Sequence, residues 1–301
     1  MLNKTIKNMK ATKKYELTDS AIEFNGVTLY RIKALKDFSN IKAGDLGGWI
    51  EKEENLSQMG NAWIGGDAKV YNNAKVFDDA QVFCDAEVYG NAQVYGNAVV
   101  FSKSKVCGNA LVYVDAKVFG DAIIYDNAEV YGNACIYDNA WVYGKSKVFG
   151  NARICNNAKV YGDARVHNHA MVGDNARVFD NARVSGNARI YGDANVCGNV
   201  YIYGNALIYG DAKVLGDVEV FGEVEICGDA KVCDDADYIV FKNFWSSKRY
   251  FTWTRSNNMW TVGCFYGTGK ELIEKAYADS EKSGREYEKI VRYVDSILAD
   301  K

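Results

Sequence analysis

A run of regularly spaced basic side chains is the feature of this sequence best suited to chemistry. Between residues 147 and 189 a basic residue stands at every sixth position except at Met171. This basic belt consists of Lys147, Arg153, Lys159, Arg165, Arg177, Arg183 and Arg189. Arginine presents a planar fork of donors that matches phosphate and carboxylate groups. The belt, together with His167 inside it, is therefore predicted to bind a small anionic ligand of nucleotide type or an acidic partner.

A purely structural interpretation of the belt stays open beside the functional one. Carboxylates at nearby turn positions, such as Asp163, Asp174 and Asp180, could offset the positive charge and leave an ordinary solvated surface. Like charges that face each other on neighbouring strands cost stability, so the belt needs some compensation.

Bases and aromatic rings also alternate near the C-terminal end of the chain. The residues are Lys248, Arg249, Trp253, Arg255 and Trp260. Nucleotide-binding surfaces combine cations with rings on which bases stack, so this set is a second candidate ligand site. A small domain also needs its tryptophans for a core, and the sequence leaves that alternative open.

The residues that enzymes and metal sites require are scarce. The chain has two histidines, His167 and His169, which is too few for a three-histidine metal site. The eight cysteines show neither paired metal-ligand spacing nor a disulfide framework and are interpreted as reduced thiols. No phosphate loop, nucleophile elbow or supported carboxylate pair is present. We expect no catalytic residue, metal or cofactor, and a binding protein rather than an enzyme. An acyltransferase that uses His167 as a general base stays open as an alternative.

A six-residue repeat organises most of the chain. From Gly60 the sequence reads GNAWIG, GDAKVY, NNAKVF and continues to Ile239, which makes 30 hexads without insertion or deletion. The fifth position is Val or Ile in 29 hexads and the third is Ala in 25, so both positions have the character of an interior.

Each preference within the hexad has a physical cause. Positions three and five point the same way along a strand, and Ala with a β-branched residue fills a narrow interior. Gly, Asn and Asp at positions one and two supply a corner, because they tolerate left-handed backbone angles. Positions four and six then face outward. The repeat predicts a mainly β fold, a three-sided parallel β-helix with 18 residues per coil and about ten coils.

The motifs ahead of and within the repeat resemble a known family. DFSNIKAGDLGGWI (residues 37–50), LSQMGNAWI (residues 56–64) and the hexads are similar to the YdcK-like, hexapeptide-repeat left-handed β-solenoid family of phage and prophage proteins. SSKRYFTWTR (residues 246–255) and GCFYGT (residues 263–268) more loosely resemble a C-terminal module of phage solenoid proteins. The resemblance implies left-handed coiling, a phage or prophage origin and the trimeric state usual for hexapeptide-repeat proteins.

The two ends of the repeat are predicted to be closed by caps, because an open solenoid end exposes unpaired backbone and core. The predicted organisation is a disordered tail (1–14), an N-terminal β cap (15–59), the solenoid (60–239) and a C-terminal α+β module (240–301). A hairpin is expected at 22–36 around Asn25-Gly26. The C-terminal module is expected to have three strands and two helices, the first of which begins at the Thr268 to Glu271 capping box.

The outward positions predict ladders and self-association. Position six is aromatic in 19 hexads, and residues 18 apart should stack in columns. This ladder is expected to fail within the belt, at His167, Gly173 and Ser185. Three aromatic stripes exceed what monomer surfaces usually expose, so we expect a homo-oligomer. The least charged outward column is predicted as its interface and contains Trp63, Gln81, Val99, Lys117, Cys135, Arg153, Met171, Arg189, Leu207 and Glu225.

The overall charge narrows the choice of partners. A formal net charge of −3 gives no case for an anionic membrane or for specific nucleic-acid binding. No apolar run suggests a signal peptide or membrane span, so a cytoplasmic location in a bacterial host is expected. The favoured function is a non-enzymatic scaffold or binding protein. A phage protein that sequesters a nucleotide-type immune signal, and the acyltransferase, stay open.

Overall fold

The computed structural model describes residues 13–244 and 248–299 of the chain. These fall into two compact units, unit 1 (Met1–Asn133) and unit 2 (Ala134–Lys301). Of the predicted tail at 1–14, only Lys13 and Lys14 lie within the described residues, and most of the turn at 246–248 lies outside them. Lys14 is packed into the cap, which corrects the prediction for that residue.

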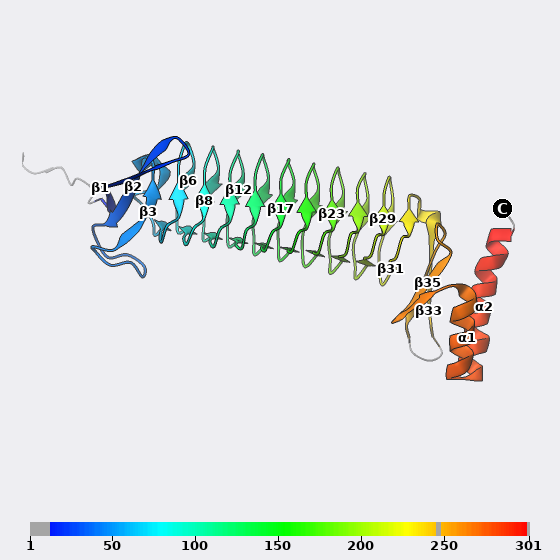
Figure 1. Ribbon diagram of the computed structural model, residues 1–301. Helices are drawn as coiled ribbons and strands as arrows, with labels where there is room; N and C mark the ends of the chain where they lie inside the picture. The colour runs from blue at the N-terminus through cyan, green and yellow to red at the C-terminus, as the bar shows by residue number, and fades with distance from the viewer. Residues whose placement is uncertain (1–12, 245–247, 300–301) are drawn as a thin grey trace, which may run out of the picture. The chain divides into compact units, whose positions relative to one another are not determined.

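The hexads of both units form the predicted parallel β-solenoid. Positions four and five of a hexad make a two-residue strand, and each strand pairs in parallel with the strand 18 residues away. Positions three and five fill the interior, as Ala164 and Val166 show with no exposed surface. Figure 1 shows the strands stacked in columns along the coils of each unit. The predicted fold class is confirmed, and the hand of the coil stays an implication of the resemblance.

The strands of unit 1 form three columns. The first holds β4 (Trp63–Ile64), β7 (Gln81–Val82), β10 (Val99–Val100) and β13 (Lys117–Val118). The second holds β5 (Lys69–Val70), β8 (Glu87–Val88), β11 (Lys105–Val106) and β14 (Ile123–Ile124). The third holds β6 (Lys75–Val76), β9 (Gln93–Val94), β12 (Leu111–Val112) and β15 (Glu129–Val130).

Unit 2 repeats the three columns. The first holds β16 (Cys135–Ile136), β19 (Arg153–Ile154), β22 (Met171–Val172), β25 (Arg189–Ile190), β28 (Leu207–Ile208) and β31 (Glu225–Ile226). The second holds β17 (Trp141–Val142), β20 (Lys159–Val160), β23 (Arg177–Val178), β26 (Asn195–Val196), β29 (Lys213–Val214) and β32 (Lys231–Val232). The third holds β18 (Lys147–Val148), β21 (Arg165–Val166), β24 (Arg183–Val184), β27 (Tyr201–Ile202) and β30 (Glu219–Val220).

The corners between strands adopt the left-handed backbone that the sequence predicted. Gly162 has a φ of 69° and Asn168 a φ of 61°. A Cβ added at Gly162 would lie 2.8 Å from the backbone nitrogen of Asp180 in the next coil, so this corner also needs the missing side chain. Corner asparagines bond to one another along the column, for example Asn157 Nδ2 to Asn175 Oδ1 at 3.1 Å. The corner residues therefore serve geometry and ladder bonding.

An N-terminal β cap closes the first coil of unit 1. Strands β1 (Tyr15–Phe24) and β2 (Val27–Ala34) form the predicted hairpin, although β1 starts earlier than expected and contains a bulge. Strand β3 (Leu46–Ile50) pairs antiparallel with β2 and parallel with β5, and a 3-10 turn, η1 (Glu53–Asn55), follows it. Figure 1 shows these strands beside the first coils of the unit.

The cap donates hydrogen bonds to the first coil. In the solenoid the backbone N–H of position four bonds to the carbonyl of position three in the next coil, as from Trp63 to Ala80, so the position-three carbonyls of the first coil are left over at the N-terminal end. Lys14 Nζ donates to the carbonyl oxygen of Ala62 at 2.7 Å, and Asn55 Nδ2 donates to that of Ala74 at 2.9 Å. Buried carbonyls without a donor would cost stability, so these two polar side chains are buried at the cap.

The solenoid ends one hexad earlier than the repeat pattern predicted. The last solenoid strand is β32, and the final hexad instead forms a 3-10 turn, η2 (Asp235–Asp237), and the start of β33 (Tyr238–Lys242). The reason is the residue at position five, because Tyr238 is too large for an interior built for Val and Ile. Its hydroxyl bonds to the carbonyl of Glu219 instead.

The C-terminal module of unit 2 is a four-stranded antiparallel sheet covered by two helices. Strands β33, β34 (Tyr250–Thr254), β35 (Met259–Val262) and β36 (Phe265–Gly267) are followed by α1 (Gly269–Asp279) and α2 (Glu281–Ala299) (Figure 1). Three strands were predicted, and Gly263, with a φ of 59°, makes the turn that divides the third into two. The predicted capping box at Thr268 and Glu271 is confirmed. No helix in the described part of the chain is long and apolar enough to span a membrane.

The module supplies side-chain acceptors for backbone N–H groups of the last coil. Backbone N–H groups of the last coil cannot bond to carbonyls of a following coil, because none follows. The N–H of Glu225 donates to Thr252 Oγ1 at 3.1 Å, and that of Lys231 donates to Ser256 Oγ at 2.6 Å. These bonds satisfy backbone groups at the C-terminal end of the solenoid, as the bonds of Lys14 and Asn55 do at the N-terminal end.

Candidate functional site

The structure places the basic belt on all three columns of unit 2. Lys147, Arg165 and Arg183 lie in register on β18, β21 and β24. Lys159 and Arg177 are paired on β20 and β23. Arg153 and Arg189 lie on either side of Met171 in the first column. The register predicted for the belt is confirmed.

The five arginines of the belt are exposed and have no carboxylate partner among the described residues. In the described residues none of Arg153, Arg165, Arg177, Arg183 and Arg189 has an ion pair within 4.0 Å or a side-chain hydrogen bond. Of the two lysines, Lys159 lies over the Trp141 ring, with Nζ 4.6 Å from its centroid. The belt is therefore a surface of guanidinium groups whose donors face solvent.

Two of the three corner carboxylates that could offset this charge form hydrogen bonds along their own corner columns. Asp174 accepts from Asn156 Nδ2 at 2.9 Å and from the Gly192 N–H at 3.0 Å, and Asp180 accepts from the Gly198 N–H at 3.3 Å. These bonds hold the corners of successive coils together. Among the described residues Asp174 and Asp180 form no ion pair with a belt arginine, so any offset of the charge by these carboxylates acts without direct contact.

Tyrosines beside the arginines stay neutral. Burial raises the pKa of Tyr137, near Arg153, to about 12. Burial also raises the pKa of Tyr161, near Arg177, and of Tyr191, near Arg189. A phenol that keeps its proton adds no negative charge at neutral pH, so these rings do not neutralise the belt.

His167 continues the aromatic ladder, contrary to the prediction. Its ring stacks on Phe149 with centroids 4.7 Å apart and 5° between the planes, because a planar imidazole can replace a phenyl ring in the column. His169 lies at a corner, with Nε2 3.2 Å from Asn151 Nδ2. Both histidines thus have structural contacts, and His167 remains half-buried.

The predicted gaps in the aromatic ladder at Gly173 and Ser185 are present, and both residues are buried. Gly173 is buried, and a Cβ added there would lie 3.2 Å from the Tyr191 ring and from Cys155 Sγ. The Tyr191 hydroxyl donates to Met171 Sδ at 3.0 Å. Tyr191 therefore occupies space that a ring at Gly173 would take. Ser185 is buried as well, with 3% of its surface exposed.

The second candidate set, in the C-terminal module, is not brought together. Trp253 and Trp260 are only 1% and 2% exposed and form the core of the module. Arg255 pairs with Asp237 at 3.6 Å. Lys248 and Arg249 are exposed near the start of β34. The two tryptophans are corrected from binding residues to core residues, because the small sheet needs their area to pack on α1 and α2.

Comparison with known proteins bears on the repeats that carry the belt. Residues 152–173 and 182–198 match the profile of the YdcK β-solenoid repeat. The predicted resemblance to the YdcK-like β-solenoid family is thus confirmed for these repeats. An alignment over 60 positions is 38% identical to the Escherichia coli (strain K12) protein named "Uncharacterized acetyltransferase YdcK". The aligned residues cover 17% of this chain and 18% of that protein. Five of the seven belt residues lie in the YdcK-like segments, namely Arg153, Lys159, Arg165, Arg183 and Arg189.

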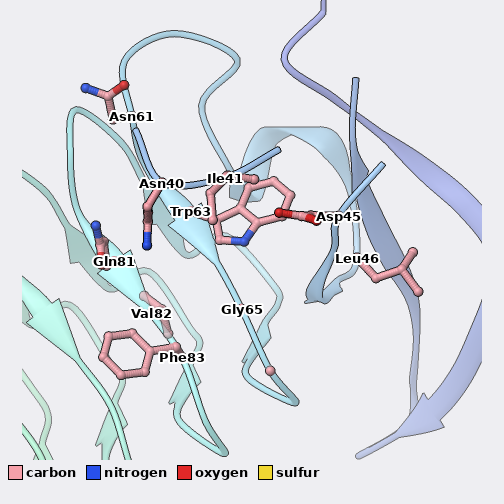
Figure 2. Close-up of a pocket in the computed structure, with 11 residues that line it drawn as sticks. Asn40, Ile41, Asp45, Leu46, Asn61, Trp63, Gly65, Gln81, Val82 and Phe83 are labelled. Carbon is pink, nitrogen blue, oxygen red and sulfur yellow. The ribbon is translucent and has the colours of Figure 1, made fainter. Parts of the chain in front are cut away.

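A pocket beside the first coils of the solenoid was not predicted. It lies in unit 1, has a volume of about 410 Å³, and is lined by Asn40, Ile41, Asp45, Leu46, Asn61, Trp63, Gly65, Gly66, Gln81, Val82 and Phe83. Figure 2 shows Trp63 at its centre, with side chains from the cap loop and from the first two coils around it. The sequence feature that could have indicated this pocket is the hexad GNAWIG, which has Trp at position four and no aromatic ring at position six.

Proposed function

We propose that the protein is a non-enzymatic β-solenoid scaffold that binds a small polyanion or an acidic partner through the basic belt of unit 2. The observation that carries this proposal is the register of Arg165 over Arg183 on neighbouring strands, with both side chains exposed and neither paired with a carboxylate in the described residues.

The electrostatic repulsion between Arg165 and Arg183 favours the binding of an anionic ligand. Neighbouring parallel strands lie about 4.8 Å apart, so two stacked guanidinium groups repel each other. A ligand with two or more adjacent anionic groups replaces that repulsion with charge-assisted hydrogen bonds, which are stronger than neutral ones. Arginine suits this role better than lysine because its fork can bind two oxygens of one phosphate. A net charge of −3 makes such a local cationic surface stand out from the rest of the chain.

Titration calorimetry with pyrophosphate as the probe tests the proposal. An Arg165→Ala/Arg183→Ala double variant should bind at least about tenfold more weakly, since hydrogen bonds to charged groups contribute about 1.5 to 3 kcal/mol each. The matched control is Lys213→Ala/Lys231→Ala, which removes the same charge from another in-register pair on β29 and β32. Equal pyrophosphate affinity in wild type and in the arginine variant would refute the proposal.

The cellular setting belongs to the same proposal. We place the protein in the cytoplasm of a bacterial host, as a prophage-encoded homo-oligomer, with a trimer favoured by the resemblance to hexapeptide-repeat proteins. In that setting a nucleotide-type immune signal is one polyanion that the belt could sequester. Native mass spectrometry of the purified protein reports subunit number and bound anion together.

A second candidate function is acetyl transfer, which the printed name of the E. coli relative favours. Within the belt His167 is the residue with general-base chemistry. An acetyl-CoA turnover assay on His167→Phe separates chemistry from packing, because phenylalanine keeps the stack on Phe149 and removes the imidazole. Turnover by wild type that is lost in this variant would favour the enzyme over the scaffold.

A further inference from the structure

The aromatic ladder of the first column in unit 1 is open at its N-terminal end. Phe83 stacks on Phe101 at 5.2 Å, and Phe101 stacks on Phe119 at 4.9 Å. The next position in this column is Gly65, which offers no ring to cover Phe83. In the second column, by contrast, the end of the ladder is covered, because Phe24 of the cap packs edge-on against Tyr71 at 5.9 Å.

The backbone does not require glycine at the open position. Gly65 is absent from the positive-φ residues of the described chain, and a Cβ added there would lie 3.7 Å from Phe83 Cβ, which is ordinary contact. The neighbouring Gly66, with a φ of 63°, already supplies the corner. The missing ring therefore leaves a cavity, and local folding does not explain the glycine.

Trp63 turns its polar edge toward this cavity. The benzo edge of Trp63 packs closely against Gly47, where an added Cβ would lie only 2.6 Å from Trp63 Cζ2. Phe38 packs edge-on against the indole, with ring centroids 5.4 Å apart. These two contacts fix the position of the indole. Its pyrrole edge faces Gly65, with Nε1 3.7 Å from the Cβ position there. The side chain is only 7% exposed, and its N–H has no hydrogen-bond partner among the described residues.

The remaining polar groups of the pocket also have unused hydrogen-bonding capacity. The side-chain amides of Asn40 and Gln81 make no hydrogen bond within the described part of the chain. Asp45 uses Oδ2 to accept from the Lys42 N–H at 2.8 Å, and its Oδ1 accepts none in the same part. Figure 2 shows Asn40 and Asp45 beside Trp63, with Gln81 and Phe83 on the coil below it.

These groups select the chemistry of a ligand. The lining holds one carboxylate and no cation, which disfavours phosphate. The uncovered face of Phe83 can stack against a planar ring of a ligand. A simple phenyl ring would leave the donors and acceptors of Trp63, Asn40 and Gln81 unused, whereas a nucleobase carries donors and acceptors in its own plane. The volume of about 410 Å³ is in the usual range for small-molecule sites.

We propose that this pocket binds an uncharged planar heteroaromatic ring of nucleobase type, which takes the ladder position left open at Gly65. In this arrangement the ring stacks on Phe83, the indole N–H of Trp63 donates to a ring acceptor, and the Asp45 carboxylate accepts from a ring or exocyclic N–H. The site differs from the belt both in residues and in the charge of its ligand.

Calorimetric titration of the full chain with adenosine, guanosine, cytidine and uridine tests this site. We expect at least one nucleoside to bind with one site per chain. A Gly65→Phe variant fills the open position with a protein ring and should weaken binding of that nucleoside by at least about tenfold, because the base can no longer stack on Phe83. Its melting temperature should equal or exceed that of wild type, because the added ring extends the ladder.

Two further variants keep the test decisive. If Gly65→Phe does not fold, Asn40→Ala changes an exposed lining residue and should also weaken the nucleoside. Arg165→Ala/Arg183→Ala should leave nucleoside binding intact, and Gly65→Phe should leave pyrophosphate binding intact. Each site is therefore tested independently of the other. Absence of binding by all four nucleosides, or wild-type affinity in both pocket variants, overturns the inference.

Discussion

A Val166→Asp variant is expected to leave unit 2 unable to fold cooperatively. Val166 is fully buried and stacks in register between Val148 and Val184. An aspartate there would place a carboxyl group in an interior of Ala, Val and Ile with no donor to pair it, at a cost of about 5 kcal/mol or more. Circular dichroism during thermal unfolding should show loss of the cooperative transition, and the soluble yield should fall.

The neighbouring residue provides the matched control. Arg165 is exposed on the same strand, so Arg165→Asp introduces the same side chain one position away on the outer face. We expect this control to change stability by less than about 1 kcal/mol, as surface substitutions usually do. If Val166→Asp unfolds at the same temperature as Arg165→Asp, the assignment of inner and outer faces is wrong.

The contribution of Lys14 to the stability of unit 1 is expected to rise between pH 7 and pH 10. Burial of this ammonium group in the cap, together with nearby Lys36, lowers the pKa of Lys14 from 10.5 to about 8. Between these two values the unfolded chain binds the proton and the folded chain does not, so stability increases with pH across the window. The pKa difference corresponds to a gain of roughly 2 to 3 kcal/mol over this range.

Urea unfolding at pH 7 and pH 10 measures this effect by comparison with Lys14→Met. The variant should lack the Lys14 contribution, whereas Lys75→Met, which changes an exposed lysine of β6, should retain it. Tyrosines of the unfolded chain, with an ordinary pKa of about 10, also ionise toward pH 10 and lower stability there, so the effect of Lys14 is read from the difference between wild type and Lys14→Met. Equal pH dependence in wild type and Lys14→Met would contradict the buried-ammonium explanation.

The architecture of the repeats followed from the sequence because period six determines which side chains share a face. Once Ala and Val or Ile occupy positions three and five, only a narrow prism buries both, and the register of Lys147, Arg165 and Arg183 follows from counting residues. The capping box of α1 was equally local, since Thr268 and Glu271 are three residues apart.

The prediction failed where a contact depended on residues far apart in the sequence. The last hexad keeps Ala236 at position three, but Tyr238 joins the antiparallel sheet of the module. The belt arginines could be placed in columns from the sequence. That Asp174 and Asp180 bond to corner backbone in the described structure, instead of to arginine, depended on side-chain geometry. The predicted gap in the aromatic ladder at His167 is wrong, because the stack of His167 on Phe149 depends on ring orientation.

The sequence by itself determined the β-solenoid, its inner and outer faces and the position of the basic columns, because each of these depends on a period of six or eighteen residues. Tertiary structure alone decided how the ends close, which tryptophans are core and where the pocket lies. Lys14 reaches Ala62, and the loop around Asp45 meets Trp63, only after the cap folds back on the first coil. Such contacts carry no periodic signal, since they join segments that the chain brings together only in space.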